Sequence, residues 1–111
     1  MLTIGRDCSY RIITRAVQHA DRPLVGLLDP GAADCAYSLD ADQLTTGLAA
    51  NPQAIIVYNQ HPDALALIER LELTEGRLLI EIRQDTKGVL GLQALRRTAA
   101  GVETLELVYQ E

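Results

Sequence analysis

The sequence predicts a three-layer α/β fold in which a five-stranded, mainly parallel sheet carries helices on both faces. Two continuous apolar runs, 24–28 and 54–58, are bounded by turn residues, as in strands that are buried on both sides. Segments with apolar residues at spacings of three and four, typical of amphipathic helices, lie between the strand-like segments. With 111 residues the chain suits one compact domain with its own core, so we assign residues 1–111 to a single domain.

The first predicted elements are a short strand at 2–5 and a helix that begins at Asp7 or Ser9 and ends near Ala20. One face of this helix is apolar, with Tyr10, Ile13, Val17 and Ala20. The opposite face is polar and mostly basic, with Arg11, Arg15, Gln18 and Arg22. This amphipathic pattern predicts a helix that packs on the sheet and exposes an arginine stripe.

The strand at 24–28 ends in an Asp-Pro-Gly turn and is followed by an irregular stretch through Tyr37. Asp40 then caps a second helix, and Gln43 stands three residues later, as a capping box requires. Asn51, followed by proline, ends this helix before the strand at 54–58, the strongest strand signal in the chain.

The second half of the chain predicts two more helices and two more strands. Pro62 suits the first turn of a third helix, and 77–83 reads as a strand with one mixed face. Thr86 can cap a fourth helix, and Gly101 suits the end of that helix. The last strand is 102–109. The apolar positions of the fourth helix are Val89, Leu92, Leu95 and Ala99.

The resulting order is β-α-β-α-β-α-β-α-β with short connections. Strands that alternate with helices favour a parallel sheet, and right-handed crossovers make it doubly wound. The expected architecture is therefore flavodoxin-like in general shape.

Composition narrows the classes of partner. Fifteen acids against ten bases leave a net charge of −5, which argues against general nucleic-acid binding. No apolar run approaches a membrane span or a signal peptide, so we expect no membrane association. Two cysteines, Cys8 and Cys35, form no metal or disulfide pattern, so we expect free thiols and a cytoplasmic location.

A ligand site can be predicted only from the fold. In doubly wound sheets ligands bind outside the carboxyl ends of the strands. The polar loop residues expected at that edge are Asp29, Asn59, His61 and Asp85. No nucleotide-binding fingerprint, nucleophile elbow or metal-ligand spacing occurs, so we predict no cofactor, no metal and no catalytic residue. Whether the chain is an enzyme stays open, with a non-enzyme favoured.

These observations favour a small non-catalytic module that binds another protein, and a bacterial regulatory or neutralising role would suit it. The arginine stripe of Arg11, Arg15 and Arg22 on an acidic chain is one candidate contact. The alternative is a small-molecule or anion-binding protein, or a small enzyme, that uses the carboxyl-edge loops. A concave pocket at that edge would favour the alternative.

The last strand also predicts self-association. It lacks proline, glycine and lysine, which commonly protect an exposed sheet edge. If it lies at the edge, two copies can pair antiparallel into a homodimer. The apolar residues expected at this contact are Leu105, Leu107 and Tyr109.

Overall fold

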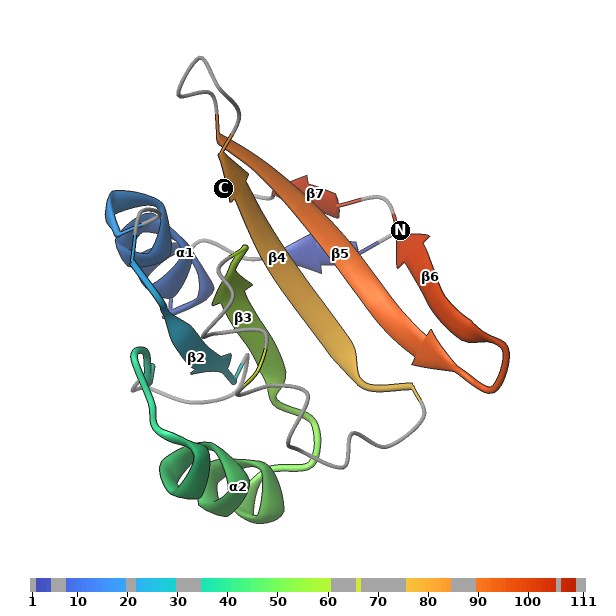
Figure 1. Cartoon of the computed structure of the whole chain (residues 1–111), viewed down its shortest axis with the longest axis horizontal. Coiled ribbons are helices and arrows are strands. Elements are labelled where there is room, and N and C mark those ends of the chain that lie inside the picture. The colour runs from blue at the N-terminus through green and yellow to red at the C-terminus, as the bar shows by residue number, and fades with distance from the viewer. Residues whose placement is uncertain are drawn as a thin grey trace.

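The computed structural model describes residues 2–4, 8–19, 22–29, 35–60, 66, 76–84, 90–105 and 107–109. Two helices and seven strands are assigned in these ranges (Figure 1). They are β1 (Leu2–Ile4), α1 (Cys8–Gln18), β2 (Val25–Leu28), α2 (Ala41–Ala50), β3 (Ile55–Asn59), β4 (Leu78–Gln84), β5 (Leu90–Thr98), β6 (Gly101–Leu105) and β7 (Leu107–Tyr109).

The main sheet has five strands in the order β2-β3-β4-β5-β6, and it is mostly antiparallel. Only β3 and β4 are parallel, with Val57 opposite Ile80. The β2–β3, β4–β5 and β5–β6 pairs are antiparallel. The prediction of a mainly parallel, flavodoxin-like sheet is therefore wrong, although the predicted number of strands in the sheet is met.

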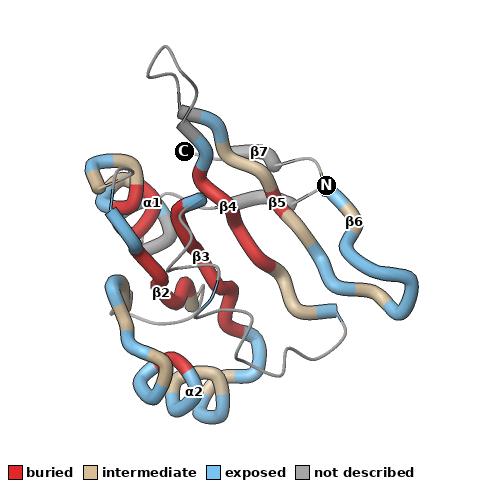
Figure 2. The backbone as a smooth tube through the Cα atoms, viewed as in Figure 1, coloured by how far each residue is buried: buried red, intermediate tan, exposed pale blue. Residues whose placement is uncertain are grey.

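The two described helices pack on opposite faces of this sheet. Ile12 and Ile13 of α1 pack in one core cluster with Val57 of β3, and Leu44 of α2 packs in a second cluster with Ile56 of β3. Neighbouring residues of β3 enter different clusters because side chains alternate along a strand. Figure 2 shows that the buried residues concentrate in β2, β3 and β4, whereas β6 is mainly exposed.

The start of α2 follows the sequence prediction closely. Asp40 is the N-cap residue, and its carboxylate accepts from the Gln43 amide at 2.8 Å. The Gln43 side chain accepts in return from the Asp40 amide at 3.0 Å, which completes the capping box. The helix ends with Asn51 as its C-cap, as predicted.

An extended return pass at 35–39 lies against the outer edge of β2. The Leu27 amide donates to the Ala36 carbonyl at 3.0 Å, and the Leu39 amide donates to the Val25 carbonyl at 2.7 Å. This pass runs antiparallel to β2 and reverses the chain before α2 begins. β3, on the other side of β2, is also antiparallel to it, so β3 and the pass run in the same direction.

The close contact between this pass and β2 depends on Gly26. A Cβ atom at this position would lie 2.8 Å from the Ala36 carbonyl oxygen and 2.9 Å from the Cα of Tyr37. Both of those atoms belong to the backbone and cannot move aside as a flexible side chain could. Glycine at position 26 therefore lets the pass lie directly against the strand.

The predicted fourth helix is wrong, because residues 90–98 form strand β5. Leu92 and Leu95 would share a helix face, but in the strand they lie on opposite faces of the sheet. Leu92 packs against the core on the α1 side, and Leu95 packs against the core on the α2 side. Gly101 has a φ of 132° and opens β6 after a two-residue turn, so it does not end a helix.

The predicted last strand is divided between two sheets. β6 pairs with β5, whereas β7 pairs in parallel with β1, with Leu107 opposite Leu2 and Tyr109 opposite Ile4. The predicted first strand is therefore confirmed, but outside the main sheet. The predicted third helix falls outside the described residues except for Ala66, which is helical.

The expectation of free thiols is also wrong, because Cys35 is disulfide-bonded. Cys8 is the only other cysteine in the sequence. The prediction of a cytoplasmic location was based on reduced cysteines and loses that support. In the described part of the chain, neither helix has the length and apolar character needed to cross a membrane.

Candidate functional site

The four predicted ligand-binding residues do not form one described cluster. Leu28 is opposite Ile55 and Val25 is opposite Tyr58, so the end of β2 lies beside the start of β3. Asp29, which follows β2, and Asn59, which ends β3, therefore lie toward opposite ends of the strands. His61 and Asp85 fall outside the described residues.

Asp29 and Asn59 each have a visible structural partner. The Asn51 side-chain amide donates to the Asp29 carboxylate, which links the end of β2 to the end of α2. Asn59 is completely buried, and its amide group donates to the carbonyls of His19 at 2.5 Å and Arg22 at 2.6 Å. Asn59 thus ties the end of α1 to β3.

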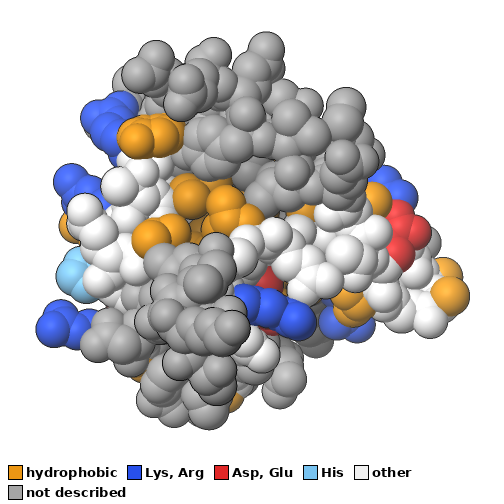
Figure 3. Space-filling model, turned by 90° about the horizontal axis from the view of Figure 1, so that it is seen from above, with side chains coloured by type: hydrophobic (Ala, Val, Ile, Leu, Met, Phe, Trp, Pro, Cys, Tyr) orange, Lys and Arg blue, Asp and Glu red, His pale blue; other side chains and the backbone are white. Residues whose placement is uncertain are grey.

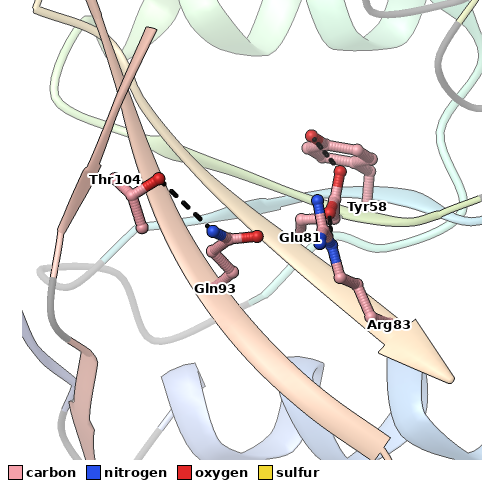
Figure 4. Close-up of polar contacts among 5 residues, drawn as sticks. All are labelled: Tyr58, Glu81, Arg83, Gln93 and Thr104. Atoms are coloured by element: carbon pink, nitrogen blue, oxygen red, sulfur yellow. Dashed lines mark hydrogen bonds and ion pairs between the residues drawn. The ribbon is translucent and has the colours of Figure 1, made fainter. Parts of the chain in front are cut away.

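A buried polar row, which sequence reasoning missed, lies on the α2 side of the sheet. Tyr58 of β3 and Glu81 of β4 are paired residues on the two parallel strands, and both are almost fully buried. The Tyr58 hydroxyl donates to the Glu81 carboxylate at 2.9 Å, and Arg83 forms an ion pair with the same carboxylate (Figure 4). The signal for this row was Glu81, which stands between Ile80 and Ile82 in the sequence of β4.

The polar row is internally neutralised. Burial, together with the hydrogen bond to Glu81 and the negative charge of that residue, raises the pKa of Tyr58 far above the ordinary value of 10.0. Tyr58 is therefore a proton donor to Glu81 over the whole physiological pH range, and Arg83 balances the carboxylate charge. This arrangement links the two central parallel strands, β3 and β4.

Gln93 of β5 extends the polar row toward the edge of the sheet. Its side-chain nitrogen donates to the Thr104 hydroxyl of β6 at 3.3 Å. Its side-chain oxygen points toward Glu81 (Figure 4). That oxygen is buried and accepts no hydrogen bond from a described residue. The link joins the body of the sheet to its last strand.

A shallow depression lies between the start of β3 and the start of β4. Its walls include Pro52, Gln53, Gly76 and Arg77, and its volume is about 80 Å³. Small-molecule sites are usually several times larger, in the range of about 300–1,000 Å³. The depression is also at the end of the strands remote from Asn59, so it does not support the predicted ligand site. Within the described ranges, no group of potential metal ligands is found.

Two residues of the predicted arginine stripe, Arg11 and Arg15, are exposed on α1, as their helical spacing predicts. Arg22 is also exposed, but it lies beyond the end of α1 at Gln18, so it does not belong to the helix face. Basic side chains gather on the α1 side of the molecule in Figure 3. The Arg15 guanidinium lies 4.5 Å from the centre of the Tyr37 ring. Arg15 therefore also holds the return pass against α1 by a cation–π contact.

The two edges of the main sheet differ in their protection. The outer edge of β2 receives the return pass at 35–39, which takes up backbone groups of Val25 and Leu27. β6, at the other edge, pairs with β5 alone among the described strands. Val102 of β6 is 56% exposed, and Thr104 is exposed as well.

The hydrogen bonds of Arg97 show which backbone groups of β6 face away from β5. The Arg97 amide donates to the Arg77 carbonyl at 3.3 Å, and the Arg97 carbonyl accepts from the Gly76 amide at 2.8 Å. Both groups therefore face the β4 side, away from Val102, the β6 partner of Arg97. Because this orientation alternates along antiparallel strands, the amides and carbonyls of Val102 and Thr104 point outward.

We call the outward backbone groups of Val102 and Thr104, with the exposed Val102 side chain, the open edge. Of the predicted contact residues, Leu105 ends β6 and is half-buried, whereas Leu107 and Tyr109 belong to β7, which pairs with β1. The contact along 102–109 stays a prediction, and the pairing of β7 with β1 limits the edge strand of the main sheet to residues 101–105. No family model, no curated protein and no solved structure matches this sequence.

Proposed function

We propose that this chain is a small non-catalytic module that binds an extended segment of another polypeptide at the open edge of β6. The observation that carries the proposal is that the outward backbone amides and carbonyls of Val102 and Thr104 have no hydrogen-bond partner among the described residues. An added strand would hydrogen-bond to these groups, and its side chains would contact Val102. A bacterial regulatory or neutralising role remains a suitable setting for such a module.

The competing function, a small-molecule or anion site, has less support. It required Asp29 and Asn59 to meet at one edge, and the β2–β3 register separates them. The buried carboxylate of Glu81 already has Tyr58 and Arg83 as partners. The net charge of −5 still disfavours nucleic acid as the partner.

Peptide selection tests the proposal. A phage library of extended peptides is selected on the native chain, and the retained peptides are measured against Thr104→Pro and Thr104→Val. Proline removes the outward amide of Thr104 without removing a hydrogen bond to β5, whereas valine keeps that amide. We expect peptides with alternating apolar residues that bind the native chain and Thr104→Val but not Thr104→Pro. Selected peptides that bind folded Thr104→Pro equally well would contradict the proposal.

A further inference from the structure

We propose, as a deepening of the proposed function, that the partner at the open edge is a second copy of this chain. The two β6 strands pair antiparallel about a two-fold axis that passes through Glu103. Residues 101–105 of the two copies then overlap completely. Val102 of each copy lies opposite Thr104 of the other, so the outward groups of both residues meet their counterparts.

In this register, Val102 of one copy and Thr104 of the other form a hydrogen-bonded pair through their outward amides and carbonyls. In antiparallel sheets such a pair exchanges two N–H to carbonyl bonds. An axis centred on Val102 would instead place Thr104 opposite Ala100, which lies in the turn between β5 and β6. Only the axis at Glu103 engages all four outward groups of each strand within its extended part.

The side chains on the α2 side suit this register. Val102 and Thr104 lie on the same face of β6, and both are exposed. Across the axis, the methyl groups of Val102 meet the methyl group of Thr104 from the other copy. The contact covers Val102, which is the most exposed large apolar side chain in the described part of the chain.

The charges on the α1 side are also compatible with self-pairing. The axis places the two Glu103 side chains opposite each other, but Arg96 forms an ion pair with Glu103 within each chain. The row across the interface therefore contains two arginines and two glutamates. The hairpin of residues 90–105 has two arginines and one glutamate, so it is slightly positive although the whole chain is acidic.

The difference between the two sheet edges explains why the assembly closes at two copies. Pairing at β6 consumes the open edge of each chain and joins the sheets into one of ten strands. The remaining edges are the β2 strands, which are covered by the return pass at 35–39. Among the described strands of the main sheet, no second edge like that of β6 is then left, so the pairing favours a closed two-fold dimer.

Sedimentation velocity over a wide range of protein concentrations tests this inference. We expect the native chain and Thr104→Val to form dimers and Thr104→Pro to lose dimerisation while keeping the native circular dichroism spectrum. A native chain that is monomeric at every concentration would overturn the inference. So would a Thr104→Pro variant that remains dimeric.

Disulfide trapping tests the position of the axis. Facing residues in a non-hydrogen-bonded antiparallel pair have Cα atoms about 4.5 Å apart, within the range that a disulfide spans. Glu103→Cys should therefore give a covalent dimer on mild oxidation. Ala99→Cys is the matched exposed control, because the axis places the two hairpin tips at opposite ends of the interface. Equal trapping of both variants, or trapping of neither, would contradict this register.

Failure of this inference can be distinguished from failure of the proposed function. If the native chain is monomeric but selected peptides bind it and not Thr104→Pro, the open edge accepts another polypeptide and the second-copy inference is wrong. If peptides bind Thr104→Pro as well as the native chain, the proposed binding mode itself is wrong.

Discussion

Ile80→Ala is expected to lower the free energy of unfolding by about 2–5 kcal/mol, because it removes buried methyl groups and leaves a cavity. Ile80 is fully buried on β4, the central strand of the main sheet. It packs in one cluster with Ile12 of α1 and Val57 of β3, so the loss loosens the contact between the helix and the sheet. Urea denaturation monitored by circular dichroism measures the change.

Val102→Ala is the matched control for this substitution. It also truncates an apolar β-branched side chain in the same sheet, but Val102 is 56% exposed. In a sample dilute enough to be monomeric, where Val102 stays exposed, its effect should stay within about 0.5 kcal/mol, as for ordinary surface positions. A loss below about 1 kcal/mol for Ile80→Ala would show that β4 is not the buried centre of the sheet.

Asn59→Asp is expected to destabilise the protein by about 2–5 kcal/mol at neutral pH. In the native chain, the buried Asn59 amide donates hydrogen bonds to the carbonyls of His19 and Arg22. The substitution replaces this amide with a carboxylate, which cannot donate to either carbonyl. The end of α1 then loses its attachment to β3. The exposed neighbour Gln60, changed to glutamate, is the control for an amide-to-acid substitution at the same strand end.

The loss of folding stability caused by Asn59→Asp should grow as the pH rises. Burial against two carbonyl oxygens raises the pKa of the new carboxyl in the folded state above the unfolded value of about 3.9. The folded state therefore holds the proton more tightly. The deficit relative to the native chain is smallest below about pH 4 and grows as the pH rises through the folded-state pKa. A deficit that does not change between acid and neutral pH would contradict this role of Asn59.

Local signals in the sequence were sufficient for most of the first 60 residues. The capping residues Asp40 and Gln43 marked the start of α2 because their side chains must satisfy backbone amides there. Continuous apolar runs marked β2 and β3 because both faces of these strands contact a helix. The predicted burial of these two runs is confirmed, since Val25, Leu27, Ile55 and Val57 are all buried.

The sheet topology could not be predicted because two segments gave misleading signals. Leu92 and Leu95 have helical spacing, but β5 is covered in part on both faces, so apolar residues occur on both of its faces. The segment at 35–39 has no strand pattern, and only its hydrogen bonds to β2 reveal that it reverses the chain. An error in either segment changes the direction of the strands that follow.

The sequence predicted a contact along the last strand, 102–109, but not the open edge at Val102 and Thr104. The predicted carboxyl-edge site assumed parallel strands, so Asp29 and Asn59 were expected together. The open edge depends on β6 being the last strand of the main sheet, and β6 becomes an edge only because β7 leaves to pair with β1. Such long-range pairing has no local signature in Val102 or Thr104.

Amide hydrogen exchange resolved by residue tests the central claim, the open edge of β6, most directly. In a dilute, monomeric sample, we expect the amides of Val102 and Thr104 to exchange almost as fast as those of an unstructured chain. The amides of Glu103 and Leu105 should be protected, because they face β5. When a second copy or a selected peptide covers the edge, protection should appear at Val102 and Thr104. Uniform protection of all four amides in the dilute sample would contradict the account.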